Sequence, residues 1–118
     1  MDEAAKRSLA QAGVDVNEAL ERFMGNESLM LKFLLRFPAD ENFSHLRQAM
    51  AAGDAAGAFA AAHTLKGVAG NLSLKGLCQP LHPLVEDLRG GNLAAAAEKM
   101  PALEAAYTQI TDLLAQLA

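Results

Sequence analysis

A histidine, a lysine and two glycines stand at helical spacing in the middle of the chain, at His63, Lys66, Gly67 and Gly70. At about 100° per residue, these positions fall within an arc of about 100° on one side of a helix. An imidazole can act as a nucleophile near neutral pH, and a lysine ammonium can stabilise an anionic group beside it. Each glycine lowers helix stability by up to about 1 kcal/mol relative to alanine. The pair therefore indicates a surface that another molecule approaches closely.

The opposite side of the same helix is apolar. It carries Ala61, Leu65, Val68 and Leu72. Because these residues lie away from His63, the helix is predicted to bury one face in a core and to leave the histidine on a separate face.

The composition is that of a single domain of ordinary size, since 118 residues can bury a core without disulfides or metals. Its 14 acidic and 10 basic residues give a net charge of −4, which argues against a nucleic-acid or anionic-membrane surface. One cysteine, Cys78, excludes an internal disulfide and a cysteine-rich zinc site, and fits a reducing compartment. No apolar run reaches the roughly 20 residues that cross a bilayer, and the first residues lack a signal-peptide block. A soluble, cytoplasmic domain is predicted.

Capping residues and glycines divide a helical apolar pattern into separate elements. Short helices are predicted over residues 2–12 and from the cap Asp15 through Phe23. A third helix begins after the cap Asn26 and breaks at Pro38. Its buried stripe is predicted to be Leu29, Met30, Phe33, Leu34 and Phe37.

Four longer helices follow. The first ends at Gly53, and the second is capped by Asp54, bears His63 and runs to about Leu72.

The third of these helices is predicted to be capped by Ser73 and to end at Gly90-Gly91, with Pro80 and Pro83 bending or splitting it. The last runs from Asn92 to the C-terminus, with a bend before Pro101. Long helices joined by short connections predict an all-α fold over residues 1–118, an antiparallel four-helix bundle with additional short N-terminal helices.

The segment from Ala62 to Asn71, AHTLKGVAGN, resembles the signature of histidine phosphotransfer (HPt) domains. The resemblance extends upstream through Asp15, the stretch RFMGN from Arg22, the stretch LLRF from Leu34, and Gly53-Asp54. It covers roughly residues 15–118, with residues 1–14 as an N-terminal helix or linker.

This resemblance implies that His63 accepts a phosphoryl group from an aspartyl phosphate on a receiver domain and passes it to another receiver aspartate. Lys66 would place positive charge near the phosphoryl oxygens, and Gly67 and Gly70 would give the partner access. No carboxylate cluster accompanies His63, so Mg²⁺ is expected on the receiver, and this chain is expected to bind no cofactor or metal.

The resemblance also implies contacts from the facing helix, where a polar side chain often approaches the imidazole. That position falls on Val85, a departure from the family pattern, and Arg89 follows one turn later. Gln79, His82, Glu86 or a water molecule remain as alternatives for orienting the ring. The residues expected to bind the partner are Phe59, Gly70, Lys75, His82 and Arg89. Phe59 has core packing as an equal alternative.

Two further classes of function remain open. One is a non-phosphorylated helical adaptor that only docks partners, and a weaker one is a haem- or metal-binding bundle using His63 and His82. Nothing in the chain resembles a nucleotide pocket, so it is not expected to be an autonomous kinase. The short run before Asp15, which carries Lys6 and Arg7, would suit the end of a linker from an upstream receiver domain, and it favours the C-terminal HPt module of a hybrid sensor kinase over a free-standing carrier. The phosphoacceptor domain of a chemotaxis kinase is a related possibility. The chain is also expected to be a monomer that contacts neither nucleic acid nor a membrane. In a longer protein it would be tethered to a membrane sensor kinase.

Overall fold

The computed structural model describes residues 1–118 and contains seven α-helices and one 3-10 turn, with no β-strand. The predicted all-α fold is confirmed. The elements are α1 (Glu3–Gln11), α2 (Val16–Arg22), α3 (Glu27–Arg36), η1 (Phe37–Ala39), α4 (Asn42–Ala51), α5 (Ala55–Asn71), α6 (Lys75–Arg89) and α7 (Leu93–Leu117).

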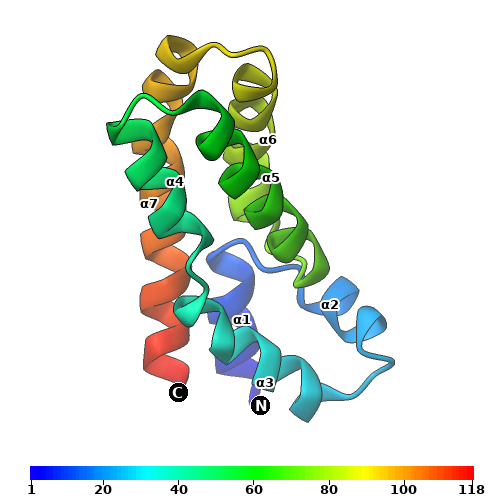
Figure 1. The fold of residues 1–118 in the computed structure, drawn as a ribbon. Helices are drawn as coiled ribbons and strands as arrows, with labels where there is room; N and C mark the ends of the chain where they lie inside the picture. Colours follow the sequence, from blue (N-terminus) through cyan, green and yellow to red (C-terminus); the bar gives the residue numbers. More distant parts are fainter.

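Helices α4 to α7 form the bundle, and each runs opposite to its neighbour in the chain (Figure 1). Helix α5 packs against α4 on one side and α6 on the other, and α6 packs against α7. The circle closes between α4 and α7, where the rings of Phe43 and Tyr107 stack with centroids 4.0 Å apart. Arg47 and Glu104 add an ion pair across the same two helices.

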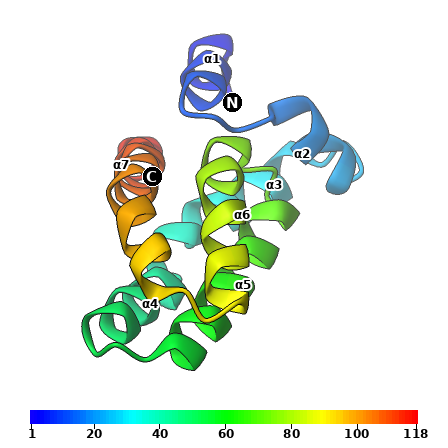
Figure 2. The ribbon, with the colours of Figure 1, turned by 90° about the horizontal axis from the view of Figure 1, so that it is seen from above.

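The three short helices gather at one end of this bundle, where α1 packs against α7 and α2 lies near the end of α5 (Figures 1 and 2). The predicted break at Pro38 is confirmed, since α3 ends at Arg36 and the chain passes through η1 into α4. Asp15, Asn26 and Asp54 cap their helices as predicted, each accepting a hydrogen bond from the backbone N–H three residues on.

The predicted cap of α6 is wrong, and of the two effects predicted for its prolines, a bend or a split, the split does not occur. Ser73 does not cap the helix: it adopts a left-handed φ of 56°, and its hydroxyl donates to Glu18 Oε1. Pro80 and Pro83 do not split the helix, which is continuous from Lys75 to Arg89. Its inner side buries Leu77, Leu81, Leu84, Val85 and Leu88. Burial of this face offsets the hydrogen bonds that the prolines cannot donate. Helix α7 likewise continues through Pro101.

The predicted stripe of α3 is only partly buried. Met30, Leu34 and Phe37 lie in the core, but Leu29 and Phe33 remain 39% and 40% exposed. The prediction is wrong for these two residues because α3 lies at the end of the bundle, where only one side of the helix is covered (Figure 1).

The inner face of α5 is built from small residues. Ala58, Ala61, Ala62, Leu65 and Ala69 are buried. Leu72 at the end of the helix is also buried and Val68 is half-buried, as the periodicity predicts, whereas His63 is exposed. The core therefore holds α5 by one face and leaves the histidine-bearing face outside.

Candidate functional site: the His63 face of α5

His63 lies in the middle of α5 with an exposed side chain. Its imidazole forms no hydrogen bond and no ion pair within the chain. The nearest aromatic group is Phe59, whose ring centroid lies 5.5 Å from that of His63 at an interplanar angle of 39°. Both ring nitrogens are thus free of intramolecular hydrogen bonds and can meet a partner molecule.

Lys66 and His82 form a contact that joins α5 to α6. The Lys66 ammonium lies 2.8 Å from Nδ1 of His82. Because an ammonium group can only donate, His82 accepts through Nδ1 and carries its proton on Nε2 when neutral. Lys66 lies one turn after His63 on the same side of α5, so His82 holds the lysine on the face that bears the histidine.

Phe59 and Arg89 form a second contact between these helices. The Arg89 guanidinium carbon lies 5.0 Å from the centroid of the Phe59 ring, and Arg89 Nε donates to Glu86 Oε2 at 3.3 Å. Phe59 is half-buried and packs against the core. Its ring therefore packs against the core on one side and contributes to the exposed face on the other, where Arg89 covers it in a cation–π arrangement.

Gly67 and Gly70 face open space, because a Cβ atom added to either would meet no other atom within 4 Å. Close packing between helices therefore does not account for these two glycines. Gly13 and Gly76 show what such packing requires, since a Cβ at Gly13 would lie 2.6 Å from the Gly76 Cα. Another molecule can therefore approach the backbone of α5 closely at Gly67 and Gly70.

The polar residues of α5 line an open depression of about 350 Å³. It is bordered by Arg22, His63, Lys66, Gly67, Gly70 and Asn71. Arg22 comes from α2, and nothing local in the sequence marks it as a site residue. The available signals are its place in the RFMGN stretch of the family resemblance and its spacing of four residues from Glu18, which predicts an ion pair on α2.

Lys75, expected at the partner surface, lies outside this depression. Its ammonium pairs with Glu18 Oε2 at 2.9 Å. This contact raises the pKa of Lys75, while Lys75, Ser73 and Arg22 together lower the pKa of the Glu18 carboxyl. Lys75 therefore belongs to the junction between α2 and the start of α6.

None of the side chains considered for orienting the imidazole contacts it through a hydrogen bond. Val85 is buried in the core, His82 bonds Lys66, and Glu86 bonds Arg89. Gln79 forms no side-chain hydrogen bond. The thiol of Cys78 is half-buried, and burial raises its pKa, which disfavours the reactive thiolate.

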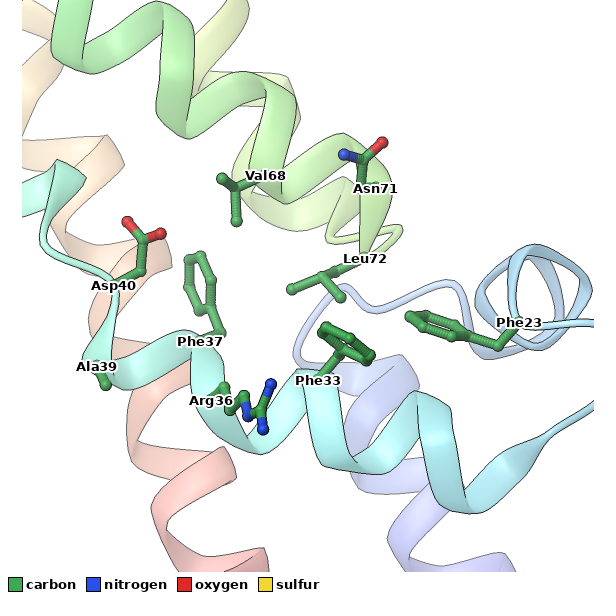
Figure 3. Close-up of a pocket in the computed structure, with 9 residues that line it drawn as sticks. All are labelled: Phe23, Phe33, Arg36, Phe37, Ala39, Asp40, Val68, Asn71 and Leu72. Carbon is green, nitrogen blue, oxygen red and sulfur yellow. The ribbon is translucent and has the colours of Figure 1, made fainter.

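An apolar groove of about 570 Å³ lies on the other flank of α5 (Figure 3). Phe23, Phe33 and Phe37 face Val68 and Leu72 across it, with the rings of Phe23 and Phe33 stacked 5.5 Å apart. Asn71 borders both this groove and the polar depression. The sequence places Phe33 and Phe37 in the core, so it gives no indication of the groove.

A family model described as the Hpt domain matches residues 34–118. The chain therefore belongs to the HPt domain family, whose members carry out histidine phosphotransfer in phosphorelays and interact with receiver domains. Searches of curated proteins and of solved structures return no match. The match covers the whole bundle and begins within α3, so the predicted extension of the resemblance to Asp15 stays a prediction.

No three His, Cys, Asp or Glu side chains lie close enough together to hold a metal ion. None of the helices combines the length and the apolarity needed to cross a membrane.

Proposed function

We propose that this HPt domain is a phosphocarrier in which His63 accepts a phosphoryl group from a receiver aspartyl phosphate and passes it to the aspartate of another receiver. The observation that carries this proposal is the exposed, unbonded imidazole of His63 in the middle of α5, in a chain whose family transfers phosphoryl groups through histidine.

In the forward step, a neutral imidazole nitrogen attacks phosphorus. The new P–N bond forms as the P–O bond to the aspartate breaks, and the aspartate leaves as a carboxylate. Because the transition state is loose, position and charge supply most of the catalysis. The second step is the reverse reaction with a different receiver.

Lys66 supplies the charge in this mechanism. One of its three N–H donors faces His82, and the others remain for phosphoryl oxygens. Their attraction grows as negative charge develops on those oxygens. Mg²⁺ is assigned to the receiver in this scheme, because the ion prefers carboxylate oxygens and no carboxylate borders the depression around His63.

The experiment is a transfer assay with purified phosphorylated receivers and Mg²⁺, in which the chain is tested for an acid-labile, alkali-stable phosphoryl group. Wild type should be labelled and His63→Gln should not. His45→Gln is the matched control, because His45 is an exposed histidine on α4 outside the site. Equal labelling of His63→Gln, or no labelling of wild type by any receiver, would contradict the proposal.

The adaptor function remains the second candidate. The apolar groove beside α5 favours it, since such a groove can bind a protein segment without chemistry at His63. In that case the His63→Gln variant should bind receivers as tightly as wild type, and neither the variant nor wild type should become labelled.

We further propose that the domain is a monomer and acts in the cytoplasm as a module of a hybrid sensor kinase. Membership of the HPt domain family supports this proposal, and the positive groups around His63 suit a receiver partner.

A further inference from the structure

Arg22 is the last residue of α2 and carries a positive charge on the rim of the depression that contains His63. Its Nε and one Nη atom each donate to Glu18 Oε1 at 3.3 Å. The other Nη atom has no hydrogen-bond partner within the chain. The side chain is 46% exposed, so this free end of the guanidinium can meet another molecule.

Glu18 fixes Arg22 in this position by tying α2 to the turn between α5 and α6. The same Glu18 Oε1 accepts from the Ser73 hydroxyl at 3.1 Å, and Oε2 pairs with Lys75. The backbone N–H of Asp15 also donates to the Ser73 carbonyl at 2.9 Å. Because α2 is held at three points, Arg22 is placed by long-range contacts and not by a flexible arm.

The position of Arg22 along α5 decides what it can contact. Glu18 and Ser73 hold α2 at the end of α5, eight residues beyond His63, which corresponds to about 12 Å along the helix. A phosphoryl group on His63 is served by Lys66, which lies one turn away, whereas Arg22 borders the same depression from the end of α5. Gly67 and Gly70 leave the space between them open. Arg22 therefore faces the surface of whatever protein covers the depression.

The charge of the two proteins indicates the kind of group that Arg22 meets. This chain carries a net charge of −4, so an acidic partner is repelled unless cations gather at the contact. A receiver that uses an aspartate and carboxylate-bound Mg²⁺ is acidic around its site. A guanidinium with a free edge is well matched to a carboxylate on the rim of such a site.

We propose that Arg22 is a partner-recognition residue that pairs with a carboxylate on the receiver surface beside the phosphorylation site. This inference rests on the proposed function. Arg22 acts on docking and not on the chemical step at His63.

The test measures the rate of transfer from a phosphorylated receiver as a function of receiver concentration at low salt. Arg22→Glu should raise the half-saturating receiver concentration about five- to tenfold and leave the limiting rate unchanged. Arg22→Gln, which creates no repulsion with Glu18, should raise it about two- to threefold. Both effects should shrink at high salt. Arg7→Glu on α1 is the matched control, because it makes the same change in net charge on an exposed arginine away from the site.

A second readout separates docking from chemistry and from folding. Small-molecule phosphoramidate can phosphorylate an accessible histidine without a protein partner, and its rate with Arg22→Gln should equal the wild-type rate. Slower phosphoramidate labelling of Arg22→Gln, or an equal effect of Arg7→Glu on the receiver reaction, would overturn the inference. If no receiver labels the wild-type chain, the proposed function is overturned. If the wild type is labelled and Arg22→Glu has the same half-saturating receiver concentration, only this inference is overturned.

Discussion

Replacing Gly67 by alanine should stabilise the domain and slow phosphoryl transfer from a receiver at the same time. Gly67 lies inside α5, and a Cβ added there meets no atom within 4 Å. Alanine is favoured over glycine inside a helix by about 0.8–1 kcal/mol. For a chain of this length, that gain corresponds to a rise of about 3–5 °C in the unfolding temperature.

The loss in transfer has a different cause. Gly67 lies about 40° from His63 around the helix, so a methyl group there stands where the receiver must bring its aspartate to the imidazole. A displacement of about 1 Å at the reacting atoms can cost up to about 10²-fold in rate, and we expect about tenfold for the single methyl group. Labelling by phosphoramidate should be unchanged because a small donor does not need the receiver's approach path.

The assay combines thermal unfolding with both labelling reactions. Gly53→Ala is the matched control: a Cβ at Gly53 also meets open space, but its φ of 68° is unfavourable for alanine. That variant should lose about 1 kcal/mol of stability and transfer normally. A Gly67→Ala variant that is destabilised, or that is more stable and transfers at the wild-type rate, would refute the reasoning.

Two further predictions follow from contacts between the helices. Lys66→Ala should slow labelling of His63 by about 10²-fold with a receiver and also with phosphoramidate, because the ammonium acts on the phosphoryl group itself; an effect confined to the receiver reaction would contradict this role. Glu18→Gln should lower the unfolding temperature at pH 7, because the Lys75, Ser73 and Arg22 contacts lower the folded-state pKa of Glu18. The ionised Glu18 carboxylate stabilises the fold at pH values above its unfolded pKa of about 4.3, and this stabilisation is lost as the pH falls through the lower folded pKa. The unfolding temperatures of wild type and Glu18→Gln should therefore converge on acidification. A constant difference between them down to pH 2 would exclude the carboxylate charge as the cause.

The bundle and the His63 face could be predicted from the sequence because both depend on local patterns. Asp54 accepts from the Gly57 N–H, and the apolar positions of α5 recur with the helical period, so the start and the buried face of that helix follow from nearby residues. The exposure of His63 then follows from its place opposite Leu65.

Contacts between distant segments could not be predicted in this way. The pair between Lys66 and His82 depends on how α5 and α6 pack, and Arg22 reaches the depression because contacts such as that of Glu18 with Ser73 hold α2 beside the end of α5. Helix α6 also continues through Pro80 because one whole face of the helix is buried against its neighbours, which local sequence does not reveal. In each case the deciding contact joins residues that no local pattern relates.

The measurement that tests the central claim most directly is the location of the phosphoryl group after transfer from a phosphorylated receiver, determined by mass spectrometry of the intact chain and its fragments under alkaline conditions. We expect one phosphoryl group per chain, on His63. A phosphoryl group on His45 or His82, or a chain that binds the receiver and stays unphosphorylated, would contradict the claim.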